Sequence, residues 1–523
     1  MFRPMYYPTV GTVILLTFTY MSMFPWAFRL MVLGVVYFFT VLMPVSAVYL
    51  YRKVLGWKLQ DLRERQRRFV PYLIHFSCYL SGMYVFSGMH MPHFLTAVLL
   101  VSLLVQSLYN IVDSIFVARL SEQALTAASL AFPVQMLMIA VGVGTAVGVN
   151  ALLSQTLGRK DYEEASRVAM TGLFLSVISA AVFTAAGLAG ARSIARSFTE
   201  DAQIGQQCGE YLFICMVFCL GNLVCMVFQR LLQAAGRAVL SMVILISGAV
   251  TNLILDPVMI FGLLGCPAMG IRGAAYATVI GQWVSMFVGL YLNLNKNPDV
   301  RLGLKGFSLS GKLIMGIYRV GLPTIIMQAM NSMMVTAFNA ILLPFSSTAV
   351  AFFGVYYKLQ NFLFMPMNGL GQAAIPIVGF NYGAGHTDRI LEASKITYAA
   401  AAAIAAVGTV VFQLFGRNLL GIFSAGEAML KIGVPALRII SLTFVFASVT
   451  MITGYIASGL GDGMTNMTGS ILRQFMPLIP CAYLLAKTGG IGPVWYAVWI
   501  SETTALIFSV FRIFRLRKTR LKL

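Results

Sequence analysis

Long apolar segments separated by short polar breaks run along almost the whole chain. A helix needs about 20 apolar residues to cross a bilayer, and a series of segments of about this length follows residue 94. The pattern predicts an all-α integral membrane protein with twelve transmembrane helices. We expect these helices at residues 95–118, 126–153, 166–189, 208–230, 238–261, 269–292, 313–343, 348–378, 391–416, 433–457, 465–486 and 491–514.

The last six predicted helices repeat the first six. Gly158 in SQTLGRKDY matches Gly383 in NYGAGH at a separation of 383 − 158 = 225 residues, and Gly236 in LQAAGRA matches Gly461 in ASGLGDG at the same separation. Parallel repeats of this kind are related by an axis along the membrane normal. We therefore expect two six-helix bundles related by internal duplication, divided into a first lobe at 95–292, a cytoplasmic linker at 293–312, a second lobe at 313–514 and a basic cytoplasmic tail at 515–523.

Residues 1–94 are a separate region, with apolar runs at 9–24, 29–51 and 70–86 and a basic stretch that ends in DLRERQRR. We expect no cleavable signal peptide, because the first run lacks a small-residue cleavage site. If the third run crossed the membrane from the basic stretch, the helix at 95 would start outside, whereas the later basic loops require it to start inside. Either that run does not fully span, or these two or three hydrophobic helices are an N-terminal membrane extension foreign to the twelve-helix unit. We assign the region no role.

Composition agrees with a membrane protein. Hydrophobic residues make up 59% of the chain and charged residues 10%, whereas a soluble domain carries about 25% charged residues. The net charge of +20 does not indicate a nucleic-acid partner, because Lys and Arg gather in the polar breaks. Cytoplasmic loops carry an excess of these residues. We therefore expect a monomeric, multi-pass protein of the cell (inner) membrane, embedded in the lipid bilayer, with a cytoplasmic C-terminus.

No motif indicates an enzyme or a cofactor. The seven cysteines form no CxxC pair and lie mostly in apolar runs, which favours small core residues over disulfides or metal ligands. His90 and His93 lack an acidic or cysteine partner nearby, so we expect no metal there. A GxxxxGK[ST] phosphate loop is absent from the sequence, which argues against direct coupling to ATP.

Charged side chains inside the predicted helices are the strongest functional signal, since a charge at bilayer depth costs about 2.5–3.5 kcal/mol even on the lenient insertion scale. Asp113 lies in the first predicted helix and Asp256 in the fifth. Asn252 lies four residues before Asp256, on the same helical face, and Thr278 on the sixth helix adds a hydroxyl. Such groups can share a proton or offer hard oxygen ligands to a small cation such as Na⁺. The alternative is a purely structural role in hydrogen bonds between helices.

The duplication assigns this ion site to the first bundle. Adding 225 to Asp113 and Asp256 gives Phe338 and Cys481, so the second half lacks both acids. We expect few other ionisable groups at depth. The polar residues there in the second half are helix-packing contacts or ligand contacts: Gln328, Asn331, Asn339 and Lys358. The predicted substrate cavity comprises Asn110, Asn150, Gln282, Gln328 and Asn331.

Several motifs in order resemble the multidrug and toxic compound extrusion (MATE) transporters. They are LYNIVDSIFVARLSEQALTAASLAFPVQ, SQTLGRKDYEEA, NLILDPVMIFG, GIRGAAYAT, GLPTIIMQ and NYGAGH, and the resemblance runs from Gln106 to the C-terminus. It implies twelve helices in two lobes and export of amphipathic, often cationic compounds in exchange for protons or sodium. In the family's DNA-damage-inducible branch the coupling network matches Asp113, Asn252, Asp256 and Thr278.

Two positions qualify the resemblance. The other main prokaryotic branch carries a Glu where this sequence has Asn331, which favours the DNA-damage-inducible branch. The family usually has a proline about four turns before the first-helix Asp, and the second half keeps its counterpart, Pro323, but the first half has Val98. A proline permits a helix to bend, so its absence puts the bending of the first helix in question.

The function predicted from the sequence is cation-coupled antiport, with H⁺ or Na⁺ as the coupling ion, of amphipathic small molecules by alternating access. A flippase of lipid-linked oligosaccharides is the alternative. It would share the helix count but should line its cavity with cations, and we expect few Arg and Lys residues within the helices.

Overall fold

The structure, a computed structural model, describes residues 120–521 apart from residue 200 and the segments 263–264, 304–308 and 422–425. The chain forms helices joined by short turns throughout this part, without a single strand. The predictions for Asn110, Asp113, Val98, the two histidines and the region 1–94 lie outside the described residues.

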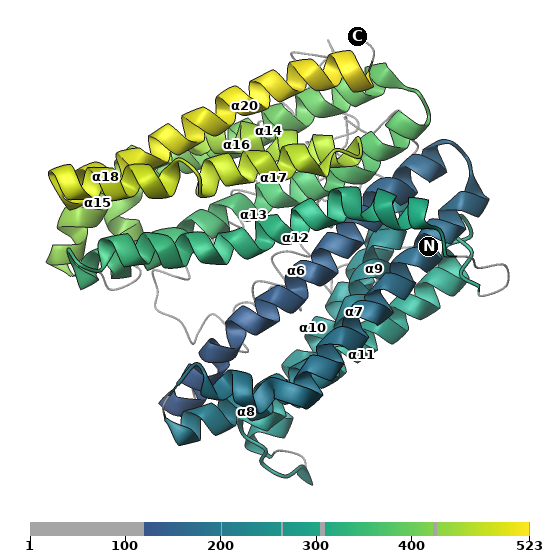
Figure 1. The fold of residues 1–523 in the computed structure, drawn as a ribbon, viewed down its shortest axis with the longest axis horizontal. Coiled ribbons are helices and arrows are strands. Elements are labelled where there is room, and N and C mark those ends of the chain that lie inside the picture. Colours follow the sequence, from purple (N-terminus) through teal and green to yellow (C-terminus); the bar gives the residue numbers. More distant parts are fainter. Residues whose placement is uncertain (1–119, 200, 263–264, 304–308, 422–425, 522–523) are drawn as a thin grey trace, which may run out of the picture.

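The described helices form two groups (Figure 1). The first, which we call the N lobe, consists of α6 (Glu122–Gly158), α7 (Tyr162–Arg196), α8 (Ala202–Val217), α9 (Leu220–Ala234), α10 (Ala238–Phe261) and α11 (Ile271–Lys296). The second, the C lobe, consists of α12 (Gly311–Leu342), α13 (Ser347–Gly383), α14 (Thr387–Gly421), α15 (Glu427–Ser441), α16 (Phe444–Gly459), α17 (Gly463–Gln474), α18 (Leu478–Gly489), α19 (Ile491–Val494) and α20 (Tyr496–Arg520).

These helices coincide with eleven of the twelve predicted spans, and the first span, 95–118, lies outside the described residues. In the described part, eight helices are long and apolar enough to cross a membrane. Two further helix pairs pass the same test together but are bent at a short break, α8 with α9 by 47° and α15 with α16 by 52°, which gives up to ten spans if each pair counts as one. The eleventh predicted span, 465–486, is broken into α17 and α18 at residues 475–477. The prediction of an all-α membrane fold is confirmed.

The duplication is visible in the backbone itself. A shift of 225 residues carries both ends of α6 onto those of α13, and both ends of α7 onto those of α14. The caps follow the same rule, since Ser121 caps α6 and Ser346 caps α13 with their side chains. The left-handed turns after α6 and α13 match too, with φ of 62° at Lys160 and 75° at Gly385. The separation deduced from two glycine pairs therefore describes the whole scaffold.

Each lobe buries its own core. Leu212 and Leu223 belong to a cluster within the N lobe, whereas Phe338, Phe352 and Trp495 belong to one within the C lobe. The outward faces of the helices carry large exposed apolar side chains, among them Leu188, Leu414 and Phe514. Such faces are stable when they contact lipid rather than water. A smaller seam joins the lobes, made of Val147, Ala151, Val320 and Ile375.

The lobes meet at one end of the molecule and diverge toward the other (Figure 1). At the meeting end a Cβ on Gly158 would overlap the Phe380 carbonyl oxygen, and one on Gly383 would overlap the Gln155 carbonyl oxygen. Glycine is required at both positions because α6 and α13 approach backbone to backbone there. The loops at this end carry Arg159, Lys160, Lys296, Arg301 and the C-terminal tail, and we call it the basic end.

Candidate functional site

Asn252, Asp256 and Thr278 form a buried cluster where α10 packs against α11. Asn252 Nδ2 donates to Asp256 Oδ1 at 3.2 Å and to Thr278 Oγ1 at 3.3 Å. The three residues are 2%, 0% and 8% exposed. Three of the four residues predicted for ion coupling therefore lie together, and the fourth, Asp113, falls outside the described residues.

The local sequence explains this arrangement. Asn252 and Asp256 are four residues apart and thus share a helix face. Gly281 allows α11 to approach closely, because a Cβ at that position would lie 3.2 Å from Asn252 Cβ. Pro257 follows Asp256 inside α10, and a proline supplies no backbone N–H and weakens the helix at that turn.

The cluster provides the chemistry of a small-cation or proton site. It combines a carboxylate, an amide and a hydroxyl, all of them hard oxygen donors. Asn252 Oδ1 accepts no hydrogen bond from the described residues, and a buried acceptor without a donor costs about 1–3 kcal/mol. A bound cation would satisfy that oxygen. The described residues contain no group of three or more His, Cys, Asp or Glu side chains fit to hold a metal ion.

The predicted cavity residues are spread over both lobes. Asn150 on α6 is fully buried beside the inter-lobe seam, and it accepts the Ser154 hydroxyl at its carbonyl oxygen at 2.7 Å. Gln282 on α11, and Gln328 and Asn331 on α12, are half-buried. In the part of the chain that the structure describes, no hydrogen bond joins any two of these four, so their common role stays a prediction.

Three charged residues at depth were missed in the sequence. Arg473 on α17 and Glu502 on α20 form an ion pair, with Nε–Oε1 at 3.1 Å and side chains 11% and 5% exposed. Arg230 on α9 donates to Gln233 Oε1 and, across the lobes, to Gln372 Oε1 on α13, both at 2.7 Å. The expectation of few ionisable groups at depth stays a prediction, but these three were not singled out in the sequence. The cost of charge at bilayer depth, applied to the predicted spans 208–230, 465–486 and 491–514, would have found all three.

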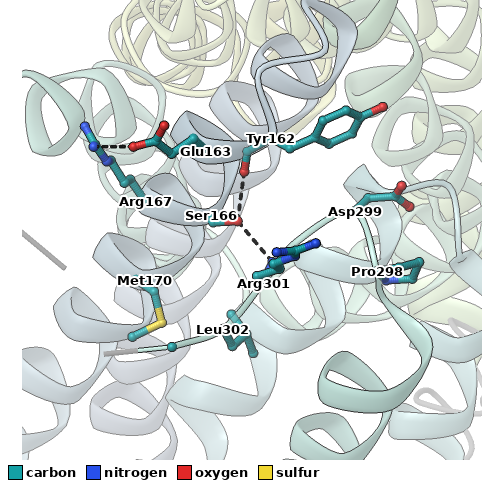
Figure 2. A pocket seen from close by; sticks show the side chains of 10 residues that line it. Tyr162, Glu163, Ser166, Arg167, Met170, Pro298, Asp299, Arg301 and Leu302 are labelled. Carbon is teal, nitrogen blue, oxygen red and sulfur yellow. Dashed lines mark hydrogen bonds and ion pairs between the residues drawn. The ribbon is translucent and has the colours of Figure 1, made fainter. Parts of the chain in front are cut away.

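Two described cavities lie away from the Asp256 cluster. One, of about 620 Å³, lies at the basic end, where the segment after α11 docks on α7 (Figure 2). There the Arg301 backbone N–H donates to Ser166 Oγ at 3.0 Å, and Asp299 pairs with Arg237 at 3.2 Å. The other, of about 660 Å³, is bordered by the Glu210–Arg272 ion pair. Neither includes a predicted site residue.

Comparison with known proteins identifies the family. The MatE family model matches residues 99–258 and again residues 323–484, so one model matches each half of the duplication. The first match begins at residue 99, which corrects the resemblance that was placed from Gln106 onward.

Relatives and solved structures cover most of the chain. The multidrug export protein MepA of Staphylococcus haemolyticus is 24% identical over 436 residues, which is 82% of this chain and 93% of the relative. The probable multidrug resistance protein NorM of Thermotoga maritima is 25% identical over 404 residues, 77% and 86% of the two chains. The outward-facing conformation of a multidrug resistance MATE family transporter superposes with a TM-score of 0.76 at 26% identity, covering 84% and 99%. A transporter of the MOP superfamily from Pyrococcus furiosus gives 0.75 at 26% identity, covering 82% and 95%.

The fold, the duplicated scaffold and the double family match point to one conclusion. This chain belongs to the MatE family and is a membrane transporter, not an enzyme.

Proposed function

We propose that this transporter is a cation-coupled antiporter, driven by H⁺ or Na⁺, that exports amphipathic, often cationic drugs or toxic metabolites by alternating access. The observation that carries the proposal is the fully buried Asp256 carboxylate, hydrogen-bonded by Asn252, which also contacts Thr278. A carboxylate at bilayer depth is expensive. A role in binding and releasing a cation would explain why a carboxylate is buried at this position despite that cost.

Ion binding in this proposal takes place between α10 and α11. Asp256 and Asn252 offer oxygen atoms, Thr278 adds a hydroxyl, and Asp113 is the proposed second carboxylate. A proton can reside on either acid, and Na⁺ can take the same oxygens as ligands. The pattern of these four residues supports a place in the DNA-damage-inducible branch of the family.

The two ends of the molecule support a proposed orientation in the membrane. Cytoplasmic loops are rich in Lys and Arg, so we assign the basic end and the C-terminus to the cytoplasm. The lobes meet there and diverge toward the other side (Figure 1), which supports an outward-facing state ready to release substrate and take up the ion. A charge that crosses 100 mV yields about 2.3 kcal/mol, enough for an accumulation of about fiftyfold.

The substrate class is proposed from the relatives, since two of them are named for multidrug export or resistance. Asn110, Asn150, Gln282, Gln328 and Asn331 are the proposed substrate contacts. Neutral amides at these positions can hydrogen-bond varied compounds without demanding one charge.

A lipid-linked oligosaccharide flippase is the second candidate, and Arg230 is the observation that favours it. Arg230 donates hydrogen bonds to two glutamine oxygens and forms no ion pair with a carboxylate of the described residues, as a site for phosphate groups would require. Arg473, the other buried arginine, is neutralised by Glu502 and offers no second cation for phosphate groups. A single arginine supports the flippase less than the Asp256 cluster supports antiport.

Transport in proteoliposomes tests the proposal. Purified protein is reconstituted, ethidium is supplied as a cationic probe, and a proton gradient and a sodium gradient are imposed separately. Ethidium accumulation driven by at least one gradient is the expected result. If neither gradient drives ethidium or another organic cation while a lipid-linked oligosaccharide is flipped, the antiport proposal is wrong.

A further inference from the structure

The ion pair between Arg473 and Glu502 is a second buried ionic centre, located in the C lobe. Arg473 lies near the end of α17, one residue before the helix stops at Gln474, and Glu502 lies in the second turn of α20. Arg473 is about 15 Å along α17 from Gly463, at 1.5 Å per residue. The pair is therefore held at depth and not at the surface of the membrane.

One carboxylate oxygen of this pair has no partner. Glu502 is 4% exposed, and its Oε2 atom is enclosed and receives no hydrogen bond from the described residues. The surroundings supply little charge. Among the described residues, Arg473 from α17 is the ion-pair partner of this carboxylate. Tyr356 from α13 and Tyr455 from α16 are neutral titratable neighbours of the pair.

A structural role alone does not account for the pair. Removing two charges from water costs several kcal/mol per ion, and well-packed apolar residues often replace a buried ion pair at no loss of stability. The α17–α20 contact also has another ion pair, between Asp462 and Arg512 near the basic end. The buried pair therefore adds a cost that helix packing does not require.

The guanidinium of Arg473 also makes a cation–π contact. Arg473 lies over the ring of Phe364, 5.4 Å from its centroid, where the face of the aromatic ring attracts a cation. Its side chain is 11% exposed, so the guanidinium is less enclosed than the carboxylate of Glu502. A guanidinium released from Glu502 would keep the contact with the ring of Phe364.

We propose that Glu502 is a second proton-binding site, which accepts its proton at Oε2 and releases Arg473 from the ion pair when it does so. One proton arrives from the outer side and converts the carboxylate to a neutral carboxylic acid, while the guanidinium stays protonated and rests on Phe364. Loss of the same proton to the inner side restores the pair. This inference rests on the proposed antiport and extends it, because each lobe then binds one cation per cycle.

The scaffold supports this assignment. Glu502 occupies the position of Ala277 in the duplication, next to the position of Thr278. The two ionic centres therefore lie at the same pair of helices in each lobe, α10 with α11 and α17 with α20. The N lobe carries its buried acid on α10, and the C lobe carries its own on α20, which is the counterpart of α11.

The number of protons per substrate tests the proposal on the wild-type protein. Ethidium distribution is measured at steady state in proteoliposomes with the membrane potential clamped at zero and a pH difference of about one unit, which supports about tenfold accumulation for each coupled proton. We expect about a hundredfold for two sites. A wild-type ratio near tenfold that Glu502→Gln leaves unchanged overturns the second site and leaves antiport intact, as does sodium-driven transport that ignores pH. A tenfold ratio that Glu502→Gln abolishes supports the second site and assigns Na⁺ to the N lobe. A ratio of one under both gradients overturns antiport itself.

Variants assign the proton to its residue. Glu502→Gln should lower the ratio about tenfold, whereas Glu502→Asp keeps a titratable carboxyl and should retain the wild-type ratio even if transport slows. Arg473→Lys keeps the opposing charge and should also retain it. A merely structural pair predicts slower transport or less folded protein at an unchanged ratio, and an unchanged ratio in Glu502→Gln overturns the proposal.

Discussion

The two lobes are built from the same helices but hold their buried acids in different ways. In the N lobe α10 is continuous through Asn252 and Asp256. In the C lobe the equivalent helix is broken at residues 475–477, and Pro477 occupies the position of Asn252. Proline has no side-chain amide and cannot donate a backbone hydrogen bond. The C lobe therefore lacks the amide that holds the acid in the N lobe, and the helix at this position is not continuous.

The C lobe compensates with an acid that has its own counter-charge. Arg473 stands at the position of Gly248, where a Cβ would overlap Ser285 Oγ because α10 and α11 pack closely. The larger side chain in the C lobe reaches Glu502 instead. An acid held by an amide keeps its charge available to an ion, whereas one held by arginine must be protonated before its partner is free. One scaffold thus accommodates buried charge in two ways.

Removing the counter-charge in the C lobe should have the largest effect. Arg473→Leu leaves Glu502 buried and unpaired, which costs about 3–5 kcal/mol. The free energy of unfolding, measured in detergent by chemical denaturation, should fall by this amount. The double variant Arg473→Met with Glu502→Met removes both charges and should recover most of it. A loss below about 1 kcal/mol, typical of a solvated surface pair, would mean that water reaches the C-lobe pair freely.

Neutralising the acid of the N lobe should remove its share of the driving force. Asp256→Asn keeps the shape and the hydrogen bonding but no longer binds a cation, so each unit of pH gradient contributes about 1.4 kcal/mol less. Ethidium accumulation should fall about tenfold for a proton-coupled cycle. The matched control is Cys481→Ser, at the equivalent position of the C lobe, which should transport as the wild type does. Equal accumulation by both variants would refute the assignment of ion coupling to the N lobe.

Removing the hydroxyl of the N-lobe cluster should have a smaller effect. Thr278→Val takes away one hydrogen-bond acceptor of Asn252, worth about 1 kcal/mol. The concentration of the coupling ion that half-activates transport should rise about fivefold, as measured by initial rates of ethidium uptake. Thr503→Val changes the equivalent residue of the C lobe and should leave this concentration unchanged. If both changes shift it equally, Thr278 has no special relation to the ion.

Local spacing made the N-lobe site predictable. Asn252 and Asp256 share a face because they are four residues apart on one helix, and that relation holds in any helix. The duplication followed from two glycine pairs, since Gly236 and Gly461 both adopt positive φ, at 75° and 78°, where glycine is strongly favoured. These features depend on short stretches of chain, so the sequence is enough to find them.

The C-lobe centre depends on packing between distant segments. Arg473 and Glu502 are 29 positions apart and meet only because α17 lies against α20. The break before α18 was also missed, since the run 465–486 is apolar throughout its second half. Pro477 alone does not predict it, because α13 stays helical through Pro366 and Pro376. Whether a proline breaks a helix depends on which neighbours satisfy the freed backbone groups.

The smallest effect is expected where the two lobes are joined. Gln372→Leu removes the acceptor through which Arg230 of the N lobe bonds the C lobe, and interhelical hydrogen bonds in membranes average about 0.6 kcal/mol. The population of molecules closed at the basic end, relative to the population open there, should fall about threefold. Distances between spin labels on the two lobes, measured by pulsed electron paramagnetic resonance, report these two populations. Gln233→Leu removes the other acceptor of Arg230, which lies on the same helix, and should shift the ratio less. An equal shift would mean that Arg230 acts within the N lobe, and that the lobes are held together at this end by the glycine contacts of α6 and α13 instead.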